Sequence, residues 1–230
     1  MTIQKKAISR GSARLSNIDD IRFTSNSWEF SYRGFGKRAL DVTLVLVLGI
    51  IVVPAILICA LLVSLDGRSP FYRQRRVGKG GVEFEMWKLR SMVHNADSKL
   101  EAYLEKNPEA RKEWDSTQKL KADPRITRIG KFIRKCSVDE LPQFWNVLMG
   151  DMSLVGPRPM LPEQRSMYRG RAYFLLRPGI SGYWQISDRN EAEFVSRVAH
   201  DTRYNEELSL TTDLWVLAKT AGPVFRGSGY

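Results

Sequence analysis

The feature that most constrains the fold is an uncharged, apolar segment of 24 residues, Val42 to Leu65. As one straight α-helix it would be about 36 Å long, enough to cross the roughly 30 Å hydrocarbon core of a bilayer. Pro54 lies near its middle, and proline kinks or breaks a helix because it lacks an amide hydrogen and its ring clashes with the preceding turn. The segment therefore predicts a membrane helix that is broken at Pro54.

Basic residues on both flanks of this segment favour a hairpin over a span. Lys37 and Arg38 precede it, and a larger group follows it: Arg68, Arg73, Arg75, Arg76 and Lys79. Such flanks face the cytoplasm, and each half of the segment is only about 16–18 Å long, too short to cross alone. We therefore expect residues 37–66 to form a re-entrant helix hairpin, with a kinked transmembrane span as the alternative.

The chain on either side of the membrane segment differs in composition. Residues 1–36 are rich in serine, asparagine and charge without a sustained period, which is typical of a flexible basic tail. This polar start also argues against a cleaved signal peptide. Residues 67–230 are long enough for one domain, which we expect on the cytosolic side of the membrane interface.

The net charge of +11 indicates an anionic partner, and nucleic acid, anionic lipid head groups and phosphorylated substrates all fit it. The two cysteines, Cys59 and Cys136, cannot form a disulfide framework and are predicted to be reduced thiols. His94 and His200 lie in no Cys/His spacing, so no zinc site is expected.

The remaining pattern predicts an α+β fold that is mostly helical, with a small β-hairpin. Alternating segments at Phe71–Gly78 and Val82–Arg90 flank the turn Lys79–Gly81 and predict the hairpin. Tyr183–Ile186, which follows a turn at Arg177–Gly182, predicts a strand. Helices are predicted at Asp97–Lys121 with a break at Asn107–Pro108, Arg125–Lys135, Leu141–Leu148, Ala192–Leu208 and Leu214–Ala221. The second and third of these are amphipathic and either pack on the core or lie in the membrane interface.

An adjacent pair of carboxylates, Asp139 and Glu140, opens the second amphipathic helix. One interpretation is a capping box, in which Ser137 and Glu140 satisfy free backbone amides. That interpretation does not account for Asp139, or for the cations nearby at Arg134 and Arg158. A carboxylate at a helix N-terminus is stabilised as an anion and can serve as a nucleophile or as a ligand of Mg²⁺.

A single arginine is held between two prolines in Gly156-Pro157-Arg158-Pro159. The prolines restrict the backbone around Arg158. The motif is either a rigid turn with a surface arginine or a preorganised guanidinium for a phosphate or a base edge.

Several long motifs occur together in register from about Lys37 to the C-terminus. They are Lys37-Arg38-x-x-Asp41, Arg73-x-x-Arg76-x-Gly78, Lys88-Leu89-Arg90-Ser91-Met92, Ser137-Val138-Asp139-Glu140-Leu141-Pro142-Gln143, Met152 to Pro159, Arg177 to Gly182 and Trp184-Gln185. With these motifs the chain resembles the bacterial sugar transferases, the monotopic polyprenyl-phosphate phosphoglycosyl transferases. It is most similar to the short members that start exopolysaccharide synthesis with galactose phosphate.

The resemblance implies a phosphoglycosyl transferase of the undecaprenyl-phosphate galactose phosphotransferase type. Asp139 would attack the β-phosphate of a UDP-sugar, releasing UMP and leaving a phosphosugar on the enzyme. Undecaprenyl phosphate would then take that phosphosugar. Glu140 would help Asp139 to hold Mg²⁺ or would manage the proton of the acceptor.

The resemblance also implies substrate-binding residues. Arg134 matches an arginine that contacts phosphate, and Arg158, between Pro157 and Pro159, matches one linked to the uridine nucleotide. Further candidates lie in the other shared motifs and at a late acidic position: Lys88, Arg90, Gln185 and Asp213. The motif after Trp184 departs from the family, because Asp188 stands where glycine is usual, and we expect this loop to take another shape beside the sugar.

The implied setting is the bacterial inner membrane, with residues 67–230 as the catalytic domain on the cytoplasmic face. The implied partners are a UDP-sugar and undecaprenyl phosphate in the inner leaflet, without nucleic acid. Galactose is the expected sugar and glucose the alternative. A membrane-tethered nucleic-acid-binding protein and a non-catalytic membrane scaffold remain competing hypotheses. The oligomeric state is left open, with a homodimer as one option.

Overall fold

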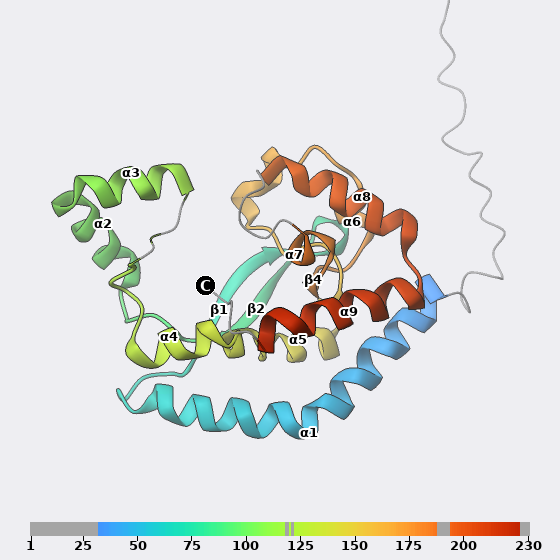
Figure 1. Cartoon of the computed structure of the whole chain (residues 1–230), viewed down its shortest axis with the longest axis horizontal. Coiled ribbons are helices and arrows are strands. Elements are labelled where there is room, and N and C mark those ends of the chain that lie inside the picture. The colour runs from blue at the N-terminus through green and yellow to red at the C-terminus, as the bar shows by residue number, and fades with distance from the viewer. Residues whose placement is uncertain (1–31, 118–119, 121, 188–193, 226–230) are drawn as a thin grey trace, which may run out of the picture.

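The computed structural model describes residues 32–117, 120, 122–187 and 194–225. Most of the described chain is helical and surrounds two small sheets (Figure 1). The predicted flexible tail lies outside the described residues, except that Tyr32–Gly36 forms a π-helical turn, η1, that leads into the first long helix. Asp188 also lies outside them.

Helix α1, Lys37–Ser64, runs along one edge of the molecule and is bent near its middle (Figure 1). Pro54 lies inside this helix. The predicted break at Pro54 is therefore wrong, since the helix continues through the proline. A proline removes one backbone hydrogen bond, and α1 continues despite that loss while it packs against α4 and α5.

Both ends of α1 are bonded to the same domain. Near its start, Asp41 accepts hydrogen bonds from Ser153 Oγ at 2.7 Å and from the amide of Leu154 at 3.0 Å. Near its end, the carbonyl of Val63 accepts a hydrogen bond from Arg90 at 3.1 Å. The helix that includes η1, Tyr32–Ser64, is long and apolar enough to cross a membrane by length and composition. The re-entrant topology and the division into three domains stay predictions.

The predicted β-hairpin is confirmed. Strand β1, Phe71–Val77, pairs antiparallel with β2, Glu83–Leu89, and the register runs from Phe71 opposite Leu89 to Val77 opposite Glu83. The short 3-10 turn η2, Lys79–Gly81, connects them, and Gly80 and Gly81 take positive φ angles that suit glycine. The charged helical region is also confirmed: α2, Ala96–Lys106, and α3, Pro108–Thr117, are divided at Asn107 and form an arm beside the hairpin (Figure 1).

A second, parallel sheet was not predicted. Strand β3, Ser153–Val155, pairs with β4, Gly179–Ser181, inside the segment that was expected to be only a turn. The strands approach closely because both carry or adjoin glycine: a Cβ on Gly179 would lie 2.1 Å from the amide nitrogen of Gly156. The predicted strand at Tyr183–Ile186 is wrong; these residues form the one-turn helix α7, which buries Trp184 and Gln185.

The remaining elements enclose the sheets. They are α4 at Arg128–Lys135, η3 at Val138–Glu140, α5 at Gln143–Met149, η4 at Pro162–Met167, α6 at Ala172–Leu175, η5 at Phe194–Ser196, α8 at Arg197–Glu207 and α9 at Leu210–Phe225. The main core joins α1, β2, α5, β3, α8 and α9 through buried side chains that include Val45, Met86, Val147, Tyr204 and Val216. Both amphipathic helices are present, although α4 begins only at Arg128, where the Thr127 side chain accepts a hydrogen bond from the amide of Gly130.

Candidate active site

The two carboxylates lie on the short turn η3 between α4 and α5. Ser137, which precedes the turn, has a left-handed backbone with φ of 55°, an uncommon conformation for a residue other than glycine. Its side chain makes no capping hydrogen bond. The capping-box interpretation is therefore wrong, and the pair Asp139–Glu140 is available for another role.

Glu140 lies in the wall of a small polar cavity of about 30 Å³. The lining comes from β1, β2, η3, α5, β4, α7 and the Pro-Arg-Pro loop: Arg76, Met86, Lys88, Glu140, Gln143, Arg158, Pro159, Gly179, Ile180 and Gln185. This volume is about that of one water molecule in the liquid. The cavity is thus the polar floor of a site, and a larger ligand would lie across its mouth.

Glu140 is held as an anion by the cations around it. Lys88 Nζ lies 3.1 Å from Glu140 Oε1, and 29% of the Glu140 side chain is exposed. Burial acts to raise the pKa of Glu140, but the charges of Lys88 and Arg158 outweigh it and hold the pKa below its usual value.

Asp139 differs from its neighbour. Burial raises the pKa of Asp139 to about 6, and the charge of Glu140 acts in the same direction, while Lys88 and Arg134 oppose the shift. A carboxylate with a pKa near 6 is a stronger base than an ordinary one yet is still ionised at neutral pH. In this pair Glu140 is therefore the more stable anion, and Asp139 is the more basic and more nucleophilic carboxylate.

Arg76, Arg158 and Arg197 lie close enough for their charges to interact, and the first two line the cavity. The guanidinium of Arg158 lies 5.5 Å from the centre of the Trp184 ring, and that of Arg197 lies 4.4 Å from it. Burial and the nearby charge of Arg158 lower the pKa of Arg76 and the pKa of Arg197 to about 10. The shift measures mutual repulsion and desolvation, so bringing an anion among these guanidinium groups would relieve it.

Asp139 and Glu140 are the two carboxylates that the sequence suggested as ligands of Mg²⁺. Among the described residues no group of three or more His, Cys, Asp or Glu side chains is close enough to hold a metal ion. Mg²⁺ is commonly bound by one or two carboxylates together with waters and substrate phosphates. Asp139 and Glu140 fit that type of site, provided that a diphosphate supplies further oxygens and that Glu140 shares its charge with Lys88.

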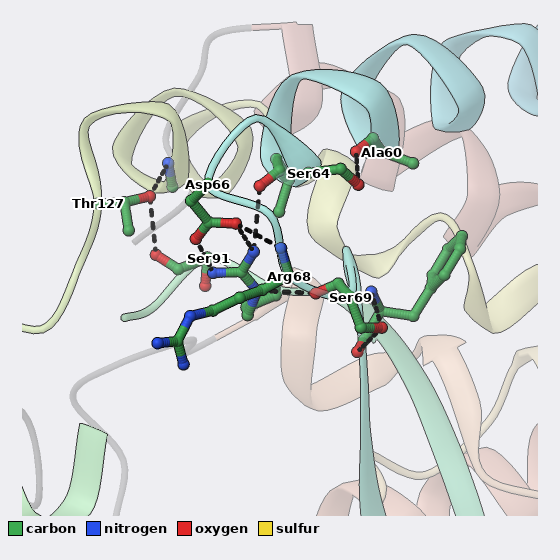
Figure 2. Close-up of polar contacts among 11 residues, drawn as sticks. Ala60, Ser64, Asp66, Arg68, Ser69, Ser91 and Thr127 are labelled. Atoms are coloured by element: carbon green, nitrogen blue, oxygen red, sulfur yellow. Dashed lines mark hydrogen bonds and ion pairs between the residues drawn. The ribbon is translucent and has the colours of Figure 1, made fainter. Parts of the chain in front are cut away.

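Asp139 and four of the predicted substrate-binding residues do not line the cavity; the four are Arg90, Arg134, Pro157 and Asp213. Two of the four are bonded to other parts of the protein, and Arg90 is the first. Arg90 donates to Asp66 at 2.6 and 2.7 Å, to the carbonyl of Ser69 at 2.8 Å and to that of Val63. Figure 2 shows Asp66 and Ser69 in this junction, beyond the last turn of α1. These contacts fasten the hairpin to the end of α1. They occupy the N–H groups with which the Arg90 guanidinium would otherwise bind a substrate phosphate.

Asp213 is the second. It is fully buried on α9, where it accepts hydrogen bonds from Lys37 Nζ and from the Tyr204 hydroxyl, each at 2.7 Å, and from the Tyr32 hydroxyl. These contacts join the start of α1 to α8 and α9. Pro157 is buried as well, and its carbonyl accepts the amide of Gly179 at 2.8 Å.

The cavity also contains residues that were not selected from the sequence. Arg76 and Gln143 line the cavity, and both belong to shared motifs. Gln143 could have been found from the sequence, because it is a polar residue in the first turn of an apolar helix, and it is only 3% exposed. Arg197 does not line the cavity and lies in no motif, and its position beside Trp184 depends on how α8 packs on α7. Sequence reasoning had no signal for that contact.

Known proteins resemble this chain over nearly its whole length. Residues 32–227 match the model of a family described as bacterial sugar transferase. A UDP-galactose-lipid carrier transferase of Erwinia amylovora is 46% identical over 211 residues, which is 91% of this chain but 44% of that protein. The exopolysaccharide production protein ExoY of Rhizobium meliloti is 43% identical over 199 residues, 85% of this chain and 88% of that protein. An undecaprenyl-phosphate galactose phosphotransferase of Salmonella typhimurium is 42% identical, and the chain again spans 44% of it.

Proposed function

This chain belongs to the bacterial sugar transferase family, and from that premise we propose that it transfers galactose 1-phosphate from UDP-galactose to undecaprenyl phosphate. UMP is the other product of the first step. The observation that carries the proposal is the adjacent pair Asp139–Glu140, ionised to different degrees and surrounded by Lys88, Arg76 and Arg158. The names of the relatives support galactose as the sugar and undecaprenyl phosphate as the acceptor.

The transfer proceeds in two displacements at one phosphorus atom. A carboxylate oxygen of Asp139 attacks the β-phosphorus of the donor, forming an acyl phosphate bond while the bridging P–O bond breaks and its electron pair leaves with UMP. An oxygen of the acceptor phosphate then attacks the same phosphorus. The bond to Asp139 breaks, the carboxylate is regenerated, and a lipid diphosphosugar is released.

Positive charge around the cavity supports this chemistry. Lys88, Arg76 and Arg158 offset negative charge on the donor diphosphate during the displacement. Mg²⁺, held by Asp139, Glu140 and the donor, would add charge neutralisation and orient the diphosphate. Arg134, whose charge lowers the pKa of Asp139, is placed to attract the same phosphate.

The exposed apolar surface of α1 supports work at a membrane. Side chains such as Ile50, Ile51 and Leu61 are each more than two-thirds exposed, and a continuous apolar surface of this kind marks a site of contact with a membrane or a partner. A lipid phosphate in the inner leaflet would thus meet a catalytic domain that is fastened to both ends of α1.

The proposal is tested by UMP release from purified protein reconstituted in membranes with Mg²⁺, undecaprenyl phosphate and a panel of UDP-sugars. We expect UMP from UDP-galactose, dependent on the acceptor, and none from Asp139→Asn. Glu163→Gln, on exposed η4, makes the same chemical change away from the cavity and should release UMP at the wild-type rate.

Each other result has a definite meaning. UMP from UDP-glucose alone would replace galactose by glucose. UMP from Asp139→Asn at the wild-type rate would remove Asp139 as the nucleophile. No UMP from any donor, with salt-dependent binding of nucleic acid or with no binding at all, would favour the nucleic-acid-binding or scaffold hypothesis.

A further inference from the structure

Asn146 is a buried polar residue on the mostly apolar helix α5, and it is only 1% exposed. Among the described residues β2 pairs with β1 alone, which leaves its other edge without a partner strand. The side-chain oxygen of Asn146 accepts a hydrogen bond from the amide of Trp87 on β2 at 3.0 Å, and its side-chain nitrogen donates one to the carbonyl of Glu85 at 2.8 Å. A carboxamide offers the same donor and acceptor as a peptide group, so Asn146 pairs with the open edge of β2 as one residue of a third strand would.

Asn146 also holds the turn that follows α5. Its side-chain nitrogen lies 3.2 Å from Oδ2 of Asp151. Its backbone carbonyl accepts the amides of three residues of this turn, at 3.1, 3.0 and 3.2 Å: Gly150, Asp151 and Met152. The turn leads into β3, and β3 leads into the Pro-Arg-Pro loop, where Arg158 lines the polar cavity. Asn146 therefore connects β2, α5 and the segment that leads to Arg158.

Asn146 does not line the polar cavity itself, but it connects the elements that carry two residues of its wall. Lys88 follows Trp87 directly on β2, and Lys88 Nζ lies 3.1 Å from Oε1 of Glu140, on the turn before α5. The hydrogen bond from Trp87 to Asn146 thus holds the backbone of β2 against α5 at the residue next to Lys88. A shift of β2 relative to α5 would change the distance between Lys88 and Glu140.

The position of Lys88 affects the charge balance at Asp139. Burial and the charge of Glu140 raise the pKa of Asp139, whereas Lys88 on β2 and Arg134 on α4 oppose that rise. Other cations that face the carboxylate pair act on Glu140: Arg158 and Arg76. The interaction between two charges weakens as the distance between them grows. Displacement of Lys88 would therefore raise the pKa of Asp139, in the same direction as removal of the Lys88 charge.

We propose that Asn146 is a positioning residue for the first displacement: its carboxamide fixes β2 against α5 and so holds Lys88 at the carboxylate pair. The inference rests on the proposed function, since Asp139 is the nucleophile of that reaction. Asn146 contacts no substrate in this role. It acts through the position of Lys88, and that dependence separates it from a residue that contributes only to stability.

Two substitutions remove the carboxamide in different ways. Asn146→Leu keeps a side chain of similar size but leaves the amide of Trp87 and the carbonyl of Glu85 without their partner, so β2 should move until water reaches them. Asn146→Ser is milder, because the short side chain leaves room for a water and the protein should fold even where Asn146→Leu does not. Leu104→Ala is the control for lost stability, since Leu104 is buried on α2 and does not line the cavity.

Two readouts on membrane-reconstituted protein follow the position of Lys88. Exchange of labelled UMP into UDP-galactose without acceptor reports the first displacement, and the acid limb of its pH profile reports the ionisation of Asp139. The rate at which acetic anhydride acylates Lys88, relative to the exposed Lys79 in the turn between the strands, reports the pairing of Lys88 without any need for activity. Peptide mass spectrometry measures this ratio, and Glu140→Gln gives its value for a Lys88 without its partner.

In both Asn146 variants we expect the acid limb of UMP exchange to move to higher pH, toward its position in Lys88→Met. The relative acylation rate of Lys88 should rise toward its value in Glu140→Gln. When Asn146→Ser is added to Lys88→Met, the acid limb should not move further, because the group through which Asn146 acts is gone. Leu104→Ala should match the wild type in both readouts.

Three results would overturn the proposal. The first is an acid limb and a relative acylation rate that stay at their wild-type values in the Asn146 variants. The second is an equal change in Leu104→Ala, which would mean that lost stability alone is responsible. The third is a full further shift when Asn146→Ser is added to Lys88→Met, which would mean that Asn146 acts through another group. Absence of UMP exchange in the wild type would reject the proposed function, while the acylation rate would still decide whether Asn146 positions Lys88.

Discussion

Lys88 Nζ lies 3.1 Å from Glu140 Oε1 and joins the β-hairpin to the turn that carries both carboxylates. The two side chains are 21% and 29% exposed, so the interaction is partly shielded from water and salt. Lys88 also lowers the pKa of Asp139. One ammonium group thus acts on both carboxylates, while the preceding residue on β2, Trp87, lines an apolar groove between α1, α5 and the hairpin.

Removal of the Lys88 charge should shift the pH dependence of the first step. Burial raises the pKa of Asp139 and Lys88 opposes that rise, so Lys88→Met should raise the pKa further and move the acid limb of the UMP exchange profile to higher pH. Lys88→Arg keeps the charge and should leave the limb close to its wild-type position. An acid limb at the same pH in all three proteins would show that Lys88 does not act on the titrating group.

In wild type, UMP exchange should fall as the pH decreases through about 6, the pKa of Asp139. The ionised carboxylate is the nucleophile, and its fraction decreases about tenfold per pH unit below the pKa. The pKa of Glu140 is held below its usual value by Lys88 and Arg158, so Glu140 loses its charge at lower pH than Asp139. The check is the profile of kcat/KM between pH 4.5 and 8 with exchange as the readout. A rate that stays constant down to the lowest pH would contradict the assignment of Asp139.

Arg197 should affect donor binding although it lies in no shared motif. It packs on one ring, Trp184, that also contacts Arg158. Arg197→Gln removes a cation from this cluster and frees Trp184 to move, so the KM for the UDP-sugar should rise by about tenfold, the usual effect of one charge-assisted contact. Arg203→Gln, an exposed arginine on the same helix, is the control. Equal KM values for the two variants would leave Arg197 with a structural role only.

The sequence was sufficient for those features that depend on local pattern. Alternation around a glycine turn predicted the hairpin, and the apolar stripe at Leu141–Leu148 predicted α5. Local pattern failed where two distant segments meet. Strands β3 and β4 pair where the backbones of Gly156 and Gly179 approach more closely than a Cβ would permit, and that contact cannot be seen in either segment alone.

The same limit applies to the site. Lys88, Glu140, Arg158, Pro159 and Gln185 were selected from motifs, and the structure brings them into one cavity. Arg90 and Asp213 came from the same kind of motif or alignment, but each is fully engaged in fastening one end of α1. A motif indicates that a position needs a given residue type. It does not show whether that residue contacts the substrate or makes a buried contact between helices and strands.

The final prediction concerns Asp213, for which the two roles give opposite expectations. Its carboxylate is buried against Lys37, and removal of one partner from a buried ion pair costs about 3–5 kcal/mol because the other charge stays buried without compensation. Asp213→Leu should therefore lower the free energy of unfolding strongly. The double variant Lys37→Met with Asp213→Leu should recover part of that loss, since the Lys37 ammonium no longer stays buried without its partner. Recovery should be incomplete, because Lys37 also offsets the charge of buried Asp41.

Chemical denaturation of the three proteins measures these changes, and UMP exchange on the folded fraction measures donor binding. An anchoring role predicts an unchanged KM for the UDP-sugar in the double variant, because Val45 on α1, Tyr204 on α8 and Val216 on α9 remain in one core while the cavity is intact. A substrate-binding role predicts a KM that stays raised in the double variant even when stability returns. The second result would mean that α1 moves enough during the reaction to bring Asp213 to the substrate.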